Sequence, residues 1–215
     1  MASFPIEALP TLSSSLQVDM DRSEGQRKVI ILDRDGTIVV DRGYLDDPAG
    51  LAFLPGAAEG LRRLHGQGYQ LVVITNQSGI GRGRFSTARL HEIHVRFAEM
   101  VSEAGARLAG VYFCPHRPDE GCACRKPQPG LVNVAAAELG FSSSAVIVVG
   151  DKASDVELGR RIGAPAVLIS ATSDGVGDAD FVAGDLVQAA QFIERLNAGR
   201  MSDGMVSHGR PHPAS

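Results

Sequence analysis

Two carboxylates follow the first strongly apolar segment of the chain. Residues 28–32 lead directly to Asp33 and Asp35, and then to Gly36 and Thr37. So uniform an apolar, β-branched run predicts a strand buried on both faces, as in a parallel sheet covered by helices. Ligands bind beyond the carboxyl ends of such strands, and two carboxylates there repel each other unless a cation such as Mg²⁺ lies between them. An acidic turn without an ion is the alternative.

A third carboxylate, Asp151, follows the apolar residues 145–149 and one glycine. If both apolar segments are parallel strands of one sheet, Asp33, Asp35 and Asp151 can share a Mg²⁺ ion that keeps positions open for water and phosphate. Asp151 could equally cap the helix that follows it. Asp155 is expected to contact the metal-binding residues without binding the ion itself, or to be an ordinary carboxylate in the first turn of that helix.

Polar residues and spaced glycines mark the end of a second apolar segment, residues 69–75. Thr75, Asn76, Gln77 and Ser78 stand here, before three glycines. Hydroxyls and backbone N–H groups between a strand and a helix suit a phosphate group. The glycine spacing matches neither the dinucleotide-binding fingerprint nor the P-loop, and a flexible turn is the alternative.

Three cysteines and one histidine lie within a single short segment. They are Cys114, His116, Cys122 and Cys124, and they include every cysteine of the chain. An odd, clustered set of cysteines favours metal binding over disulfides. A Cys₃His set fits a closed, tetrahedral, structural zinc site, so Zn²⁺ is the predicted metal.

Two basic residues, Arg125 and Lys126, come directly after the last cysteine. A loop held by zinc would place them rigidly over the edge of the sheet, where their charges can neutralise a phosphate and its transition state. Solvated surface residues are the alternative interpretation of this pair.

Strands and helices alternate along the chain, which predicts a parallel sheet built from right-handed crossovers. The expected strands cover residues 28–32, 69–75, 110–114, 145–149 and 165–169. The expected helices cover residues 55–66, 87–104, 129–139, 154–162 and 185–196.

Length and composition suit one globular domain. The chain has 215 residues, of which 44% are hydrophobic and 21% charged, and its formal net charge is −4. We expect a disordered extension over residues 1–26, a domain over residues 27–197 and a flexible tail over residues 198–215. The acidic balance argues against nucleic-acid binding, and no apolar run has the length of a membrane span. The first residues do not form a signal peptide, which favours a cytoplasmic protein.

Four motifs taken together resemble the haloacid-dehalogenase superfamily, and within it the histidinol-phosphatase-like group. The motifs are DRDGT, TNQSGIGRG, CPHRPDEGCACRKPQPG and VVGDKASD, and the similarity covers about residues 28–169. The resemblance implies a three-layer, Rossmann-like α/β fold with a central parallel sheet and a zinc-stapled loop. No insertion is large enough for a cap domain.

The resemblance also implies roles for single residues. Asp33 would be the nucleophile, and Asp35 the general acid and then the general base. Asp33, the carbonyl of Asp35 and Asp151 would bind Mg²⁺, while Thr75 and Lys126 would hold the transferring phosphoryl group. Further positions match substrate contacts: Asp41, Arg42, Gly43, Tyr44, Asn76, Gln77, Ser78, Arg125 and Lys152. The zinc ligands implied are Cys114, His116, Cys122 and Cys124.

The expected substrate is a small phosphorylated sugar. Cationic residues exceed what one phosphate needs, which favours a heptose 1,7-bisphosphate cleaved at its 7-phosphate. The short RPDEG segment between His116 and Cys122 is closer to histidinol-phosphate phosphatases, so histidinol phosphate stays open as the substrate. A non-catalytic, zinc-stapled binding module and a nucleic-acid 3′-phosphatase are further alternatives. We expect a monomer.

Overall fold

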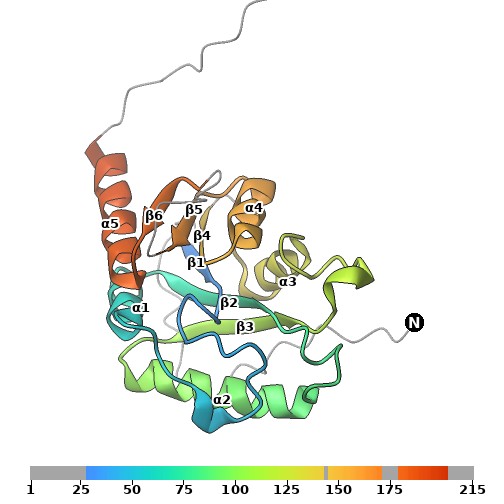
Figure 1. Cartoon of the computed structure of the whole chain (residues 1–215). Helices are drawn as coiled ribbons and strands as arrows, with labels where there is room; N and C mark the ends of the chain where they lie inside the picture. Colours follow the sequence, from blue (N-terminus) through green and yellow to red (C-terminus); the bar gives the residue numbers. More distant parts are fainter. Residues whose placement is uncertain (1–27, 143–144, 171–178, 203–215) are drawn as a thin grey trace, which may run out of the picture.

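The computed structural model describes residues 28–142, 145–170 and 179–202 (Figure 1). Residues 1–26, the predicted extension, and residues 203–215 of the predicted tail lie outside the described residues. Within the described part, no helix combines the length and the apolar character needed to cross a membrane.

One parallel sheet forms the centre of the fold. Its strands lie in the order β3-β2-β1-β4-β5-β6, so the chain begins in the middle and extends to each edge in turn. The strands are β1 (Val29–Leu32), β2 (Gln70–Asn76), β3 (Leu108–Cys114), β4 (Val146–Gly150), β5 (Ala166–Ile169) and β6 (Phe181–Ala183). This order places the ends of β2, β1 and β4 next to one another.

Helices cover both faces of the sheet and complete three layers. The helices are α1 (Ala57–Gly66), α2 (Thr87–Glu103), α3 (Gly130–Leu139), α4 (Ala153–Ile162) and α5 (Leu186–Ser202). Apolar side chains of α1, α2 and α5 pack on one face, and those of α3 and α4 on the other. In Figure 1, α1 and α5 lie side by side.

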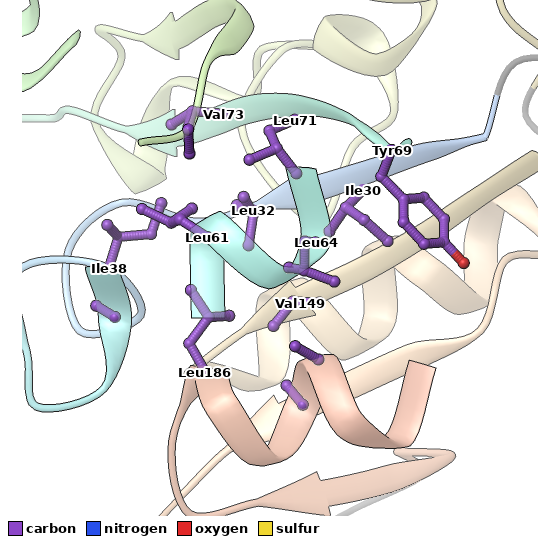
Figure 2. Packing of buried hydrophobic residues seen from close by; sticks show 14 of the residues in the cluster. Ile30, Leu32, Ile38, Leu61, Leu64, Tyr69, Leu71, Val73, Val149 and Leu186 are labelled. Carbon is purple, nitrogen blue, oxygen red and sulfur yellow. The ribbon is translucent and has the colours of Figure 1, made fainter. Parts of the chain in front are cut away.

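The alternation of side chains along β1 explains why this strand is buried on both faces. Ile30 and Leu32 belong to the cluster under α1 and α5, whereas Val29 and Ile31 belong to the cluster under α3 and α4. Figure 2 shows the first cluster, with Ile30 and Leu32 packed near Leu64 of α1. The prediction of a strand buried on both faces is therefore confirmed.

The long connections carry little further structure. The connection after β1 contains a 3₁₀ turn, η1 (Pro48–Gly50), and two isolated β-bridges of Val39, with Asp35 and Phe53. The cysteine loop contains a second 3₁₀ turn, η2 (Pro118–Glu120). Among the described residues neither connection forms a cap domain, in agreement with the sequence.

Most predicted elements form within two residues of their expected bounds, because local end signals were present. Ser86 caps α2 by accepting a hydrogen bond from the Arg89 backbone N–H, and Gly140 ends α3 with a φ of 68°. A capping hydroxyl and a residue with positive φ are the groups that satisfy free backbone groups at helix ends.

Two predictions of the element bounds were wrong. The strand β6 was missed, because its three residues are too few for a pattern and pairing with β5 defines it. The last helix continues to Ser202 and so passes the expected helix end at residue 196.

Candidate active site

The strand order brings the predicted polar residues to one edge of the sheet. Asp33 follows β1, Thr75 and Asn76 end β2, and Asp151 follows β4. The Asp33 backbone N–H donates to the Val149 carbonyl at 3.0 Å, which continues the pairing of β1 with β4 up to the site.

A buried lysine lies between two carboxylates at this edge. The Nζ atom of Lys126 is 3.0 Å from Asp33 Oδ1 and 2.7 Å from Asp155 Oδ1. All three residues are buried. Burial alone would lower the pKa of Lys126, but the two carboxylates raise it above its usual value, so the side chain stays cationic. The ammonium group is therefore held directly beside one oxygen of Asp33.

Three carboxylates form a compact group that suits a hard cation. One oxygen each of Asp33, Asp151 and Asp155 lies within 4.8 Å of the others. Burial, followed by the charges of Asp33 and Asp155, raises the pKa of Asp151 to about 6. One buried lysine does not balance three carboxylates, and a divalent ion with oxygen ligands would remove the remaining repulsion. The donor set therefore fits Mg²⁺.

The Asp35 carboxylate is not part of this acidic group and has other partners. It accepts hydrogen bonds from the guanidinium of Arg34 and, at 2.7 Å, from Gln77 Nε2. The same Gln77 amide donates to Thr75 Oγ1 at 2.9 Å. Gln77 thus links the end of β2 to the turn after β1. Of Asp35, only the backbone carbonyl remains a candidate metal ligand.

Asn76 holds the backbone of Lys126. Its side-chain oxygen accepts from the Lys126 N–H at 3.0 Å, and its side-chain nitrogen donates to the Lys126 carbonyl at 3.2 Å. Both polar atoms of the Asn76 amide are therefore engaged by the chain itself. Asn76 thus positions the backbone of Lys126. Its contact with substrate, which the resemblance implied, stays a prediction.

The rim of the site carries exposed charges. Lys152 Nζ lies 3.2 Å from Asp41 Oδ2 and 4.0 Å from Asp151 Oδ2. Burial opposes the shift, but the Gly43 N–H and Lys152 lower the pKa of Asp41. On the same rim, the Arg84 guanidinium lies 5.6 Å from the centre of the exposed Tyr44 ring. Arg42 donates to the Gly50 carbonyl.

The three thiols and His116 converge in the loop after β3. Cys124 Sγ lies 3.2 Å from His116 Nδ1, 3.3 Å from Cys114 Sγ and 3.5 Å from Cys122 Sγ. Burial and the neighbouring Cys124 thiol raise the pKa of Cys114. Sulfur atoms around tetrahedral zinc are about 3.8 Å apart, so four ligands this close need little movement to bind one ion.

The cysteine loop is tied to the rest of the site. Arg125 Nη1 donates to the His116 carbonyl at 3.2 Å. The glycine-rich loop after β2 is attached as well, because the Gln77 N–H donates to the Cys114 carbonyl and the Gly81 N–H to the Pro115 carbonyl. A change in the cysteine cluster would therefore reach the residues after both β2 and β3.

Three contributors were missed or underestimated by sequence reasoning. Arg34 is almost completely buried and pairs with Asp35, and Asp155 binds Lys126 directly. Thr37 donates from Oγ1 to Asp151 at 3.2 Å. A charged residue at the end of a fully buried strand was the available signal for Arg34. Nothing in the sequence near Asp155 indicates its partner, Lys126, which is distant in the chain. Ser78 is half-buried and stays a prediction.

Replacing Gly36 by Ala is expected to lower turnover at least about tenfold and stability by about 1–3 kcal/mol. Gly36 has a φ of 87°, and a Cβ there would meet the Asp151 carboxylate. Phosphate release and thermal denaturation measure the two effects. The control is Gly68→Ala, since Gly68 has a φ of 84° but no neighbour within 4 Å of an added Cβ. Equal activity loss in both variants would show that the contact with Asp151 is unimportant.

Fold and site together define the class of protein. A parallel α/β sheet with acidic residues after its first strand, a hydroxyl after the second and a buried lysine beside the acidic group is the arrangement of haloacid-dehalogenase-type hydrolases. A family model described as HAD-hydrolase-like matches residues 123–194. This segment includes Lys126, Asp151 and Asp155.

Similar proteins identify the family more closely. The D-glycero-beta-D-manno-heptose-1,7-bisphosphate 7-phosphatase of Haemophilus influenzae is 37% identical over 182 residues, which are 79% of this chain and 98% of that protein. The enzyme of the same name from Pseudomonas aeruginosa is 38% identical over 151 residues, covering 70% and 84% of the two chains. The chain belongs to the haloacid-dehalogenase-like phosphatase family that contains these proteins.

Solved structures agree with this assignment. The D,D-heptose 1,7-bisphosphate phosphatase of B. bronchiseptica, complexed with magnesium and phosphate, superposes with a TM-score of 0.71 at 32% identity. The match covers 79% of this chain and 99% of that chain. The corresponding phosphatase of Burkholderia thailandensis has a TM-score of 0.59 at 30% identity, and the match covers 78% of this chain and 99% of that chain.

Proposed function

We propose that the protein is a Mg²⁺-dependent phosphatase that removes the 7-phosphate of a D-glycero-D-manno-heptose 1,7-bisphosphate. The observation that carries the proposal is the Asp33 carboxylate at the end of β1, with Lys126 Nζ at 3.0 Å and two further carboxylates beside it. The names of the relatives support the sugar and the bond, and the exposed cations of the rim support a substrate with a second phosphate.

Asp33 is the proposed nucleophile. One carboxylate oxygen attacks the phosphorus, the bond from phosphorus to the sugar oxygen breaks, and an aspartyl-phosphate forms. Lys126 and the Thr75 hydroxyl compensate the charge on the phosphoryl oxygens as the transfer proceeds. Mg²⁺, held by Asp33, Asp151 and the carbonyl of Asp35, would supply further positive charge at those oxygens.

Asp35 is the proposed proton carrier. In the first step its carboxyl group gives a proton to the departing sugar oxygen, and in the second it takes one from the water that attacks the aspartyl-phosphate. This second attack releases inorganic phosphate and regenerates Asp33. The side chain of Asp35 is 16% exposed, which leaves its carboxylate accessible to substrate and water.

The cysteine cluster is proposed to bind one structural zinc ion. All four candidate ligands belong to the protein, so no position stays open for substrate. The ion would order the loop that carries Arg125 and Lys126. We propose that the enzyme works as a monomer in the cytoplasm.

A second phosphate on the substrate explains the surplus of basic groups. Asp33, Lys126, Thr75 and Mg²⁺ account for the phosphate that is transferred. Arg125 remains beyond them, anchored by its bond to the His116 carbonyl. A guanidinium fork binds phosphate well, whereas the far end of histidinol phosphate is an amine, which would prefer carboxylates. The shortness of the cysteine loop is the one feature that favours histidinol phosphate.

Replacing Arg125 by Ala is expected to lower kcat/KM for the heptose bisphosphate about 10- to 100-fold, because a charge-assisted hydrogen bond contributes roughly 1.5–3 kcal/mol. For histidinol phosphate, which lacks the second phosphate, the loss should stay below about threefold. Steady-state phosphate release with both substrates provides the measurement.

Wild-type protein and a control variant separate the possible failures. Arg107 is exposed just before β3, at the end of that strand opposite to the site, so Arg107→Ala should leave both kcat/KM values unchanged. If wild type prefers histidinol phosphate, the heptose assignment is wrong. If Arg125→Ala hydrolyses the bisphosphate normally, only the role of Arg125 is wrong.

A further inference from the structure

Arg34 is the largest side chain that is fully buried in the described part of the protein. Only 1% of the residue is exposed, although arginine is almost never buried to this degree unless it is paired. The side chain turns back onto the next residue, Asp35. The carboxylate of Asp35 therefore compensates the charge of the buried guanidinium.

The contact between the two residues is a fork. Nε of Arg34 lies 3.1 Å from Asp35 Oδ2, and Nη2 lies 2.8 Å from Oδ2 and 3.1 Å from Oδ1. A planar guanidinium that contacts both oxygens fixes the plane of the carboxylate as well as its distance. Gln77 Nε2 donates a further hydrogen bond to Asp35 Oδ2 at 2.7 Å.

The charge of Arg34 also acts on a buried histidine, His94. His94 of α2 is 1% exposed, and burial, followed by the charges of Arg34 and His91, holds its pKa well below the usual range. Within the described residues, neither nitrogen of His94 nor Nη1 of Arg34 has a hydrogen-bond partner. A neutral imidazole adds no second positive charge that could compete with Arg34 for the Asp35 carboxylate.

We propose that Arg34 is a positioning residue that acts on the reaction through Asp35. The guanidinium fixes the carboxylate of Asp35 in the plane from which it exchanges protons with the sugar oxygen and with water. The inference rests on the proposed acid and base role of Asp35. A buried ion pair often adds little net stability, so an arginine buried here is explained if its fork supports catalysis.

A double-mutant cycle with Asp35→Asn tests the inference. Arg34→Lys keeps the charge and removes the fork, so kcat for the heptose bisphosphate should fall at least about tenfold while KM changes less than about threefold. In the Asp35→Asn background the same substitution should change the rate less than about twofold, because its target is already absent. Single-turnover phosphate release measures the slow variants.

Each outcome supports or overturns one statement. Equal losses in both backgrounds, or no loss from Arg34→Lys alone, overturn the inference. A normal kcat in Asp35→Asn alone overturns the proposed role of Asp35, and the inference with it. If Arg34→Lys does not fold, Arg34→Gln enters the same cycle, since it retains an amide donor without burying a free charge.

A surface arginine provides the control. Arg96→Lys changes the same residue type on α2, where the side chain is exposed and paired with Glu99 and Glu103. Its kcat should match wild type within about twofold, because exposed ion pairs contribute little. Thermal denaturation of all variants then shows whether any loss of rate follows a loss of fold.

Discussion

Replacing Asp33 by Asn is expected to lower kcat at least about 10⁴-fold while the fold remains intact. The amide has nearly the same shape, and its oxygen can still accept the hydrogen bond that the Arg34 N–H donates at 2.7 Å. An amide oxygen, however, is a poor nucleophile toward phosphorus and cannot form the aspartyl-phosphate. The rate of phosphate release at saturating substrate and Mg²⁺ measures the effect.

Acid-quenched mass spectrometry adds a direct test of the same step. A phosphoryl adduct should be detected on wild-type protein during turnover and be absent from Asp33→Asn. The control is Asp46→Asn, because Asp46 is exposed in the connection after β1 and its substitution should leave kcat within about twofold of wild type. A near-normal kcat in Asp33→Asn would exclude the covalent mechanism.

The sheet and its catalytic edge could be predicted because their signals are local. Each buried strand is an apolar run that ends in polar residues, as at Asp33 and Asp151, and parallel pairing then places these ends together. The cysteine cluster was equally visible, since its four residues lie close in sequence. For the cysteine cluster, spacing along the chain and distance in space carry the same information.

The remaining features depend on contacts between residues that are far apart in the chain. Nothing near Asn76 indicates that its amide holds the backbone of Lys126, and nothing near Asp155 indicates that it pairs with the same lysine. Arg34 is a different case, because arginine is usually exposed and its burial follows from the carboxylate beside it. Pattern reasoning places residues at an edge but does not give their partners.

These long-range contacts give the cysteine loop a direct influence on the chemistry. The carbonyl of Cys114 accepts from the Gln77 N–H, and Gln77 in turn contacts Asp35. Cys124 directly precedes Arg125 and Lys126 in sequence. The loop therefore supports Asp35, the proposed proton carrier, on one side and Arg125 and Lys126, the proposed phosphate-binding cations, on the other.

Loss of the proposed zinc site is consequently expected to impair both stability and turnover. Cys122→Ser should reduce zinc from about one ion per chain to almost none, because a neutral hydroxyl is a poor substitute for a thiolate. The free energy of unfolding should fall by more than about 3 kcal/mol, and kcat/KM at least about 100-fold. The two remaining thiols, without an ion, no longer fix the loop that holds Lys126 against Asp33.

Metal analysis of protein produced without added zinc gives the content, and denaturant unfolding and phosphate release at saturating Mg²⁺ give the two consequences. Asp119→Ser is the matched control, because Asp119 lies in the same loop with its side chain 71% exposed and outside the four-ligand cluster. That variant should keep both its zinc and its rate. A folded, fully active Cys122→Ser protein without zinc would show that hydrogen bonds such as Gln77 to Cys114 order the loop by themselves, and that the cysteines serve another purpose.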